Sequence, residues 1–405
     1  MRVTINKSIA KGRIIAPPSK SYAHRLLIAA ALSDGRTVVN NVVMSKDILA
    51  TINCLKTLGK HVEYVDNKII ISKEKDINQL NNELVFDCNE SGSTLRFFIP
   101  IALTTGKKVI FKGTQRLIER GIGPYEEICS KQNIEVIKDL TSITFNGKLK
   151  SDDFNVPGNI SSQFITGLLF ATPLLENDSK ITITTTLESK NYIDITLDVL
   201  KKTNITIVND NNAFLIKGSQ QYHVSELTVE GDYSNAAFLD SFNYLGGNVV
   251  IDGLVNDSLQ GDRVYKECFE KLNKGFAKID ISNCIDLGPI LFCFAALKHG
   301  GHFVNTSRLK IKESNRVEDV AIELNKFGVK VTDLGNEVLI DNSILHKPIV
   351  ELNGRNDHRI VMALSVMLSV FGGTINGTKA VEKSYPNFFS DLKTIGIEVE
   401  DENGQ

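Results

Sequence analysis

Long apolar runs preceded by short polar clusters recur six times along the chain. Each run has helical spacing and is apolar on nearly every face, as in LLIAAAL after Arg25 and ITGLLFATPLL after Phe164. A helix that is apolar all round must be buried within its domain, so we expect six buried helices. The polar clusters start at Ser19, Ser91, Ser161, Asp232, Asp286 and Asp357, in steps of 70 to 72 residues apart from one step of 54.

A second marker repeats with the same step. After each apolar run comes an amphipathic helix that should end in Gly or Asn, residues that favour a left-handed helix C-cap, followed by two short alternating strands such as VEYV and IIIS. The expected helix ends are Gly59, Asn133, Asn204, Gly275, Gly328 and Gly396. Together the two markers predict six βαββαβ-like repeats, of which the fourth is shortened.

Repeats of this kind favour an α/β architecture over an all-helical solenoid, because the strands need the helices to cover them. A chain of 405 residues is also too long for one ordinary hydrophobic core. We therefore predict two domains with three repeats each.

The starts of the apolar helices carry candidate binding residues. A helix N-terminus presents unpaired N–H groups and a partial positive charge, and it attracts anions. N-capping alone could account for the Ser and Asp residues there. It does not account for the other polar residues of the same turns, which are Lys20, Arg25, Arg96, Gln163, His358 and Arg359.

Composition narrows the class of protein. The chain is 42% hydrophobic and 23% charged with a formal net charge of −2, which argues against a nucleic-acid-binding protein and requires a local cationic cluster for any anionic ligand. No run of 18 apolar residues suggests a membrane span, and the N-terminus does not resemble a signal peptide. The six cysteines lack a C-x-x-C pair or zinc-type spacing, so we expect free, mostly buried thiols in a cytoplasmic protein without a metal site.

The polar clusters also resemble those of a known family. In chain order, from about Lys11 to Gly396, they match the motifs of the 5-enolpyruvylshikimate-3-phosphate synthase family of enolpyruvyl transferases. The matching strings are Pro18-Ser-Lys-Ser with Arg25, Gly92-Ser-Thr-Leu-Arg96, Glu119-Arg120, Ser161-Ser-Gln-Phe, Lys312-Glu-Ser-Asn-Arg316, Asp357-His-Arg359 and Lys383 before Pro386.

This resemblance implies an inside-out α/β barrel in two lobes that close over the substrates. Residues 1–18 and 231–405 would form the C-terminal lobe with repeats 4 to 6, and residues 19–230 the N-terminal lobe with repeats 1 to 3. It further implies a monomer in the shikimate pathway of aromatic amino-acid biosynthesis. Such an enzyme moves the enolpyruvyl group of phosphoenolpyruvate onto the 5-hydroxyl of shikimate-3-phosphate, releases phosphate and needs no cofactor.

By the same resemblance, two overlapping sets of residues would bind the substrates. Both substrates carry phosphate and carboxylate groups, which the planar fork of arginine matches well. The set for shikimate-3-phosphate is Lys20, Ser21, Arg25, Ser161, Ser162, Gln163, Ser189, Tyr192, Asp286 and Lys312. The set for phosphoenolpyruvate is Lys20, Gly92, Arg120, Gln163, Arg316, His358, Arg359 and Lys383.

An addition–elimination reaction needs one group that takes the hydroxyl proton and another that exchanges the proton at C3 of phosphoenolpyruvate. Asp286 starts a nearly charge-free helix, where an apolar wall could tune its pKa, and we predict it as the base. Glu313 is the candidate for the C3 proton, with Lys20 as a competing acid. N-capping is the alternative role for Asp286, and a purely structural role that for Glu313.

Several positions depart from the usual motifs of the family, namely Gly121, Ser93, Phe97, Asn315 and Arg308. Two other functions compete with the main hypothesis. A UDP-N-acetylglucosamine enolpyruvyl transferase would carry a cysteine where this chain has Gln115, and it would lack the Lys312–Arg316 string. A non-catalytic anion-binding repeat protein would not need Asp286 and Glu313.

Overall fold

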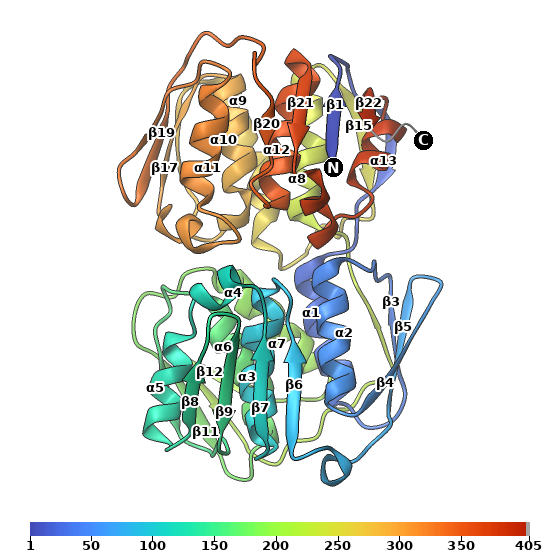
Figure 1. Ribbon diagram of the computed structural model, residues 1–405, viewed down its shortest axis with the longest axis vertical. Helices are drawn as coiled ribbons and strands as arrows, with labels where there is room; N and C mark the ends of the chain where they lie inside the picture. The colour runs from blue at the N-terminus through green and yellow to red at the C-terminus, as the bar shows by residue number, and fades with distance from the viewer. Residues whose placement is uncertain (402–405) are drawn as a thin grey trace. The chain divides into compact units, whose positions relative to one another are not determined.

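The computed structural model describes residues 1–401. The chain forms two compact units (Figure 1). The N-terminal unit is Lys20–Glu230, and the C-terminal unit combines Met1–Ser19 with the chain from Gly231 onward. Each unit has its own hydrophobic core. An antiparallel bridge between Pro18 and Gly231 joins the two segments of the C-terminal unit where they meet.

The six apolar runs are buried helices, which confirms the first marker. Nearly every residue of each is buried, except for polar residues of the first turns such as Lys20, Ser93 and Gln163, which are half-buried. In the N-terminal unit they are α1 (Lys20–Leu32), α3 (Gly92–Thr104) and α6 (Ser162–Ala171), and in the C-terminal unit α8 (Tyr233–Ser241), α10 (Gly288–Leu297) and α12 (His358–Phe371).

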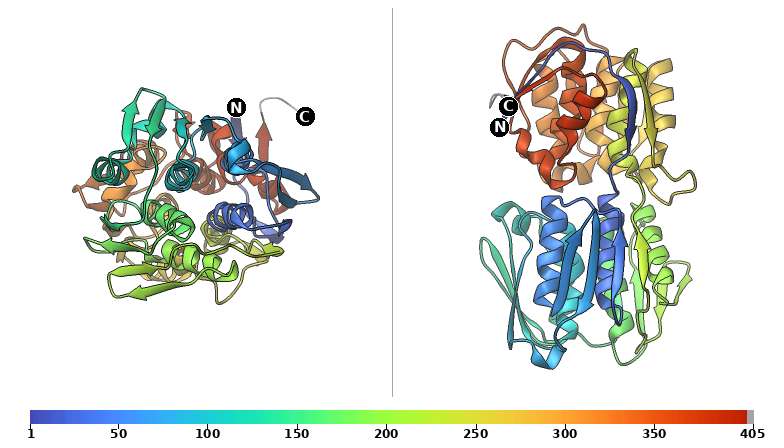
Figure 2. Two further views of the ribbon diagram at one scale, coloured as in Figure 1. Left: turned by 90° about the horizontal axis from the view of Figure 1, so that it is seen from below. Right: turned by 90° about the vertical axis from the view of Figure 1, so that its right-hand side faces the viewer.

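The sheets lie on the outside of each unit and the apolar helices on the inside, which is the inside-out arrangement (Figure 2). Strand patterns explain this layering, since in β6 (Glu83–Asp87) Leu84 and Phe86 are buried while Glu83, Val85 and Asp87 are exposed. The second, amphipathic helices of the repeats are α2 (Lys46–Thr57), α5 (Gly123–Lys131), α7 (Lys190–Lys202), α9 (Tyr265–Lys274), α11 (Arg316–Asn325) and α13 (Phe388–Thr394).

A complete repeat runs strand, buried helix, parallel strand, amphipathic helix and antiparallel hairpin. In the second repeat β6 pairs in parallel with β7, and β7 and β8 both pair antiparallel with β9. The third and fifth repeats have the same strand order, β10-β11-β13-β12 and β16-β17-β19-β18. Their strands are β7 (Lys108–Lys112), β8 (Glu135–Lys138), β9 (Ser142–Asn146), β10 (Asp153–Val156), β11 (Ser179–Ile183), β12 (Ile207–Asp210), β13 (Ala213–Ile216), β16 (Ala277–Asp280), β17 (Gly301–Val304), β18 (Val331–Asp333) and β19 (Glu337–Ile340).

Distant segments complete the other three sheets. The last strand of the N-terminal unit, β14, pairs in parallel with β3, and β1 lies between β21 and β22 in the order β20-β21-β1-β22. The fourth repeat has only two strands, β2 and β15. These strands are β1 (Arg2–Ile5), β2 (Lys11–Ile15), β3 (Thr37–Asn40), β4 (Lys60–Val65), β5 (Lys68–Lys73), β14 (Glu226–Thr228), β15 (Asn248–Asp252), β20 (Leu352–Asn353), β21 (Gly373–Asn376) and β22 (Val399–Asp401).

The left-handed helix ends of the second marker are confirmed at five of its six positions. Gly59, Asn133, Asn204, Gly328 and Gly396 have left-handed φ angles between 55° and 87°. Gly275 is a correction, because its φ of 164° is extended and no hairpin follows α9. The chain there passes directly into β16, the first strand of the fifth repeat, which explains the short step of 54 residues. Gly396 is followed by one strand only, since β1 from the N-terminus takes the place of the second.

All six cysteines are buried and none forms a disulfide, as predicted. Within residues 1–401, no helix combines the length and the apolar character that crossing a membrane would require.

Candidate active site

In the N-terminal unit, Lys20 and Arg25 project from the first turns of α1. The Lys20 ammonium lies 2.8 Å from the Asp47 carboxylate on α2. Arg25 is buried, and its Nε donates to the Thr196 hydroxyl on α7 at 2.8 Å. Burial lowers the pKa of Arg25 to about 10, which still leaves the guanidinium charged at neutral pH. This buried cation is therefore held by neighbours on other elements before any ligand is considered.

Two aromatic rings lie against Arg25, and the helix that carries one of them, α7, is preceded by a strained residue. Its guanidinium carbon lies 5.0 Å from the ring centre of Phe97 and 5.7 Å from that of Tyr192. Ser189, just before α7, has a left-handed φ of 54°, a conformation that costs a serine roughly 1–3 kcal/mol. Strain of this kind is typical of functional sites, and both Ser189 and Tyr192 belong to the predicted set for shikimate-3-phosphate.

Gln163, in the first turn of α6, links the starts of two buried helices. Its Oε1 accepts from the Arg96 guanidinium on α3 at 2.6 Å, and its Nε2 donates to the Ser93 hydroxyl at 3.0 Å. The same guanidinium donates to the backbone carbonyls of Arg120 and Gly121, each at 3.1 Å. Arg96 thus fixes both Gln163 and the turn that carries Arg120.

Gly92 is the first residue of α3, and Arg120 lies against its backbone. A Cβ added at Gly92 would come within 2.9 to 3.1 Å of the Arg120 guanidinium atoms. Ser91 caps the helix, since its side chain accepts from the Thr94 N–H. A glycine here lets a guanidinium approach the positive end of a helix, where two kinds of donor can serve one anion.

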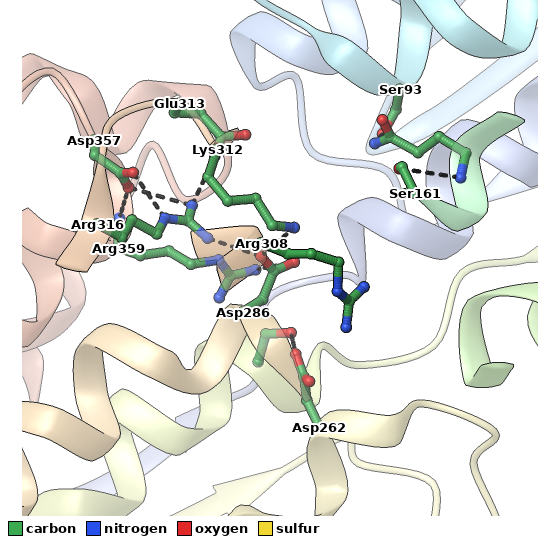
Figure 3. Close-up of polar contacts among 12 residues, drawn as sticks. Ser93, Ser161, Asp262, Asp286, Arg308, Lys312, Glu313, Arg316, Asp357 and Arg359 are labelled. Atoms are coloured by element: carbon green, nitrogen blue, oxygen red, sulfur yellow. Dashed lines mark hydrogen bonds and ion pairs between the residues drawn. The ribbon is translucent and has the colours of Figure 1, made fainter. Parts of the chain in front are cut away.

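In the C-terminal unit, Arg316 is the centre of a buried cluster of charges (Figure 3). Its side chain is 1% exposed, and it donates at 2.8 Å to each of three carboxylates: Nε to Asp357, one terminal nitrogen to Asp286 and the other to Glu313. These carboxylates come from the starts of α12 and α11 and from the turn before α10. One arginine therefore positions both predicted acid–base residues.

Three cations surround Asp286. Lys312 lies 3.1 Å from its Oδ1, which also accepts from Arg316, and Arg359 lies 3.5 Å from its Oδ2. Burial on its own would raise the pKa of Asp286, but Lys312, Arg359 and Arg316 together hold that pKa well below its usual range. The sequence indicated an apolar wall that could tune this pKa, and the neighbouring cations outweigh the effect of burial because all three lie within 3.5 Å of the carboxylate.

Asp286 does not cap the helix that follows it. It lies in a short 3₁₀ turn, Ile285–Leu287, and the N-cap position of α10 is Leu287, without a side-chain hydrogen bond. The capping alternative is therefore wrong for Asp286. It is right at other helix starts, where Ser91, Ser161, Asp232 and Asp357 each accept from a backbone N–H of the first turn.

The remaining predicted residues of this unit lie nearby in sequence and structure. His358 is fully buried beside Asp357, whose Oδ1 accepts from the Arg359 backbone N–H at 2.9 Å. The Lys383 ammonium donates to the Asn356 carbonyl at 2.6 Å, just before α12. The start of α12 thus gathers His358, Arg359 and Lys383.

Sequence reasoning missed several residues that hold the predicted ones. Asp357 stood within a predicted motif, yet its pairing with Arg316 was not foreseen. Arg96 was singled out at a helix start without being assigned to a substrate, and Asp47 was not proposed at all. Arg96 stood in a helix-start motif, which was a usable signal. Asp47 gave none, because its contact with Lys20 joins two helices that no pattern connects.

Comparisons with known proteins point to one family. The family model described as EPSP synthase (3-phosphoshikimate 1-carboxyvinyltransferase) matches residues 5–392. A 3-phosphoshikimate 1-carboxyvinyltransferase of Clostridium perfringens (strain 13 / Type A) is 41% identical, and one of Clostridium acetobutylicum is 42% identical; each match covers 98% of both chains.

Solved structures show the same fold. The chain is similar to EPSP synthase from Acinetobacter baumannii, with a TM-score of 0.78 and 19% identity over 99% of this chain and 100% of that one. The enolpyruvyl transferase NikO from Streptomyces tendae gives a TM-score of 0.76 at 11% identity, over 98% of each chain. With a family model that spans nearly the whole chain and relatives at about 40% identity, the chain belongs to the EPSP synthase family.

Proposed function

We propose that this chain transfers the enolpyruvyl group of phosphoenolpyruvate to the 5-hydroxyl of shikimate-3-phosphate, with release of phosphate, as a step of aromatic amino-acid biosynthesis. The observation that carries the proposal is the cluster around Arg316, in which Asp286 and Glu313 are fixed by one buried guanidinium. A base and a proton donor at fixed positions are what an addition–elimination reaction requires.

The N-terminal unit supplies groups for the phosphorylated ring. In this proposal Lys20, Ser21 and Arg25 at α1, together with Ser161, Ser162 and Gln163 at α6, bind the shikimate-3-phosphate, with Ser189 and Tyr192 beside them. The polar network among these residues supports the assignment, because side chains already held by hydrogen bonds lose little freedom when a ligand binds. Asp286 and Lys312 of the C-terminal unit complete this set.

Phosphoenolpyruvate needs cations and N–H donors. Arg120 against the backbone of Gly92 offers both, and Gln163 beside Arg96 adds an amide donor. Arg316, Arg359, His358 and Lys383 are the predicted contacts from the C-terminal unit, with Lys20 shared between the substrates. Arg316 is already bonded to three carboxylates, so any contact that it makes with phosphoenolpyruvate is added to, or exchanged for, one of these.

The chemistry follows from the charges around Asp286. The ring hydroxyl gives its proton to Asp286 and attacks C2 of phosphoenolpyruvate, while C3 gains a proton from Glu313, or from Lys20 as the alternative. The same group then takes a proton back from C3, the C2–O bond to phosphate breaks, and phosphate leaves. An ionised Asp286 is ready to accept a proton, and substrate anions that draw Lys312 and Arg359 away would make it a stronger base.

Charge also accumulates on the tetrahedral species formed by the addition. Fixed cations stabilise such charge with little reorganisation. Among the proposed groups, Arg316 is of this kind, since three carboxylates hold its guanidinium. We further propose that the enzyme acts in the cytoplasm as a monomer and requires no metal or other cofactor.

Purified protein incubated with phosphoenolpyruvate tests the function directly. Phosphate should appear when shikimate-3-phosphate is present and stay at background when UDP-N-acetylglucosamine replaces it. The Asp286→Asn variant, purified in the same way, controls for contaminating enzymes. Phosphate release with UDP-N-acetylglucosamine, or none with either acceptor, would overturn the proposal.

A further inference from the structure

A carboxyl outside the predicted set lies beside the charged cluster of the C-terminal unit. Asp262 is part of a short 3₁₀ turn, Gly261–Val264, and the preceding Gln260 ties this turn to the start of α8. The Gln260 amide donates to the Gly231 carbonyl at 2.8 Å and accepts from the Tyr233 N–H at 3.0 Å. The position of Asp262 is therefore fixed by the fold.

Asp262 is buried, and only one of its two carboxyl oxygens has a hydrogen-bond partner among residues 1–401. Asp262 is 3% exposed, and the Ser234 hydroxyl donates to its Oδ2. Its Oδ1 is buried and has no hydrogen-bond partner among residues 1–401. A carboxylate in such surroundings is costly unless other charges compensate for it or a proton neutralises it.

Charged groups on several elements act on Asp262. Asp286 repels it from the turn before α10, Arg359 attracts it from α12, and Asp232 repels it from the start of α8. The negative charge of Asp262 also acts to raise the pKa of the thiols of Cys268 on α9 and of Cys284. Burial first, and then repulsion by Asp286, raise the pKa of Asp262 to about 7.

Two carboxyls of opposite tendency thus lie in the field of one arginine, Arg359, which is paired with Asp286 at 3.5 Å and attracts Asp262 without a direct contact. Asp286, with three cations, keeps its negative charge, whereas Asp262 holds a proton at mildly acid pH and releases it to solvent near neutrality. Figure 3 shows Asp262 close to Asp286 and below it, with Arg359 next to Asp286. When environments drive the pKa values of two neighbouring acids apart, they commonly serve distinct roles.

We propose that Asp262 is a positioning residue whose negative charge competes with Asp286 for Arg359 and so makes Asp286 a readier proton acceptor. When Asp262 is protonated, the Arg359 guanidinium stabilises the negative charge of Asp286 alone, and Asp286 is then a weaker base. With Asp262 ionised, the same guanidinium is shared and the proton affinity of Asp286 increases. The inference rests on the proposed role of Asp286 as the base.

The test is the pH dependence of kcat at saturating substrates, measured from about pH 5.5 to 9. In the unaltered protein kcat should rise about threefold to tenfold in a step near neutral pH. This is the increase expected when the pKa of Asp286 rises by one or two units and only part of that change in basicity is expressed in the rate. Asp262→Asn should remove this step and keep kcat near the low-pH level. Ser234→Ala should move the step to higher pH, because the Ser234 hydroxyl stabilises the ionised Asp262.

Each alternative outcome is informative. A step that persists unchanged in Asp262→Asn, or a kcat lowered by one factor at every pH, would overturn the inference while leaving the function intact. Absence of phosphate release from the unaltered protein would instead contradict the proposed function. A second readout needs no activity: the carboxylic-acid C=O band in the infrared difference spectrum between the unaltered protein and Asp262→Asn should disappear between about pH 6 and 8. A protein without this band at pH 6 would also overturn the inference.

Discussion

At the scale of single residues, the proposed role of Asp286 is to remove the hydroxyl proton. Its charge is stabilised by Lys312, Arg316 and Arg359, and an amide of the same size cannot accept the proton. We expect Asp286→Asn to lower kcat by roughly 10²–10⁴, the usual range for a positioned proton-transfer group. Binding of phosphoenolpyruvate should change little, since the cations remain. Steady-state kinetics and equilibrium binding measure the two effects separately.

A matched control is available on the surface of the same unit. Asp252 pairs with Arg13 at 3.0 Å in an exposed position, so Asp252→Asn should leave kcat unchanged.

Glu313→Gln should slow the exchange of solvent deuterium into the C3 methylene at least as much as it slows turnover. Near-normal turnover in Asp286→Asn would remove that residue from the mechanism, and normal exchange in Glu313→Gln would leave Lys20 as the next candidate.

Gly92 determines how closely Arg120 approaches the start of α3. The methyl group of Gly92→Ala would lie about 3 Å from the guanidinium, which can move because it ends a flexible side chain. We therefore expect normal stability but a KM for phosphoenolpyruvate raised roughly ten- to hundredfold, as loss of a charged hydrogen bond implies. Gly275→Ala is the control, because nothing lies within 4 Å of its added Cβ. An unchanged KM in Gly92→Ala would mean that Arg120 does not bind this substrate.

The raised pKa of Asp262 also predicts how the stability of the folded protein depends on pH. Its folded pKa of about 7 lies above the ordinary 3.8, so between these values the folded protein holds a proton that the unfolded chain has lost. Stability should therefore fall as pH rises from about 4 to 7, and the cost persists above 7. Asp262→Asn removes this cost. The gain in the free energy of unfolding of this variant over the unaltered protein should therefore be larger at pH 8 than at pH 5, by on the order of a few kcal/mol. Urea unfolding at the two pH values measures the difference; an equal effect at both would contradict it.

At the scale of elements, the buried helices combine capping with chemistry in adjacent residues. Asp357 accepts from the first turn of α12 and also holds Arg316, while the next two residues are predicted ligands. Ser161 caps α6, and Gln163 two residues later links to α3. One turn of helix therefore provides both the fold and the site, which explains why apolar runs and polar clusters repeat together.

This coupling limited what the sequence could predict. The apolar runs fixed the six buried helices, because burial on every face is visible in the residues themselves. Partners across helices are not visible in this way: Arg316 and Asp357 are 41 residues apart, and Lys20 and Asp47 meet only because α1 packs on α2. The low pKa of Asp286 was not foreseen for the same reason, since Arg316 and Arg359 come from α11 and α12 and Lys312 comes from the segment just before α11.

The strand β1 illustrates a contact of even longer range. Val3 and Ile5 are fully buried, and β1 pairs with both β21 and β22 near the other end of the chain. We expect Ile5→Ala to lower the free energy of unfolding of the C-terminal unit by about 2–5 kcal/mol, the usual cost of such a cavity. Thr4→Ala on the opposite face should cost only about 1 kcal/mol, for one hydroxyl contact with Thr374. Equal losses in the two variants, measured by urea unfolding, would exclude a core role for Ile5.

At the scale of the whole molecule, the two units differ in how the chain builds them. Every strand of the three sheets in the N-terminal unit comes from residues 37–228, and its core lies between Tyr22 and Val229. The C-terminal unit needs two strands from the N-terminus, β1 and β2. The repeat pattern predicted three repeats per domain, but it could not show which sheet a distant strand would join, since strand pairing leaves no periodic signal. That the lobes close over the substrates stays a prediction.

This difference predicts opposite behaviour for the two units as separate fragments. Residues 20–230 should fold alone with one cooperative urea transition, because no sheet in that fragment is incomplete. Residues 231–405 should not, because β21 and β22 lose the strand between them and β15 loses its partner, which leaves buried backbone groups unpaired. Joining residues 1–19 to the C-terminus of that fragment through a flexible Gly/Ser linker should restore a cooperative transition. Cooperative unfolding of residues 231–405 without this addition would show that β1 and β2 are dispensable.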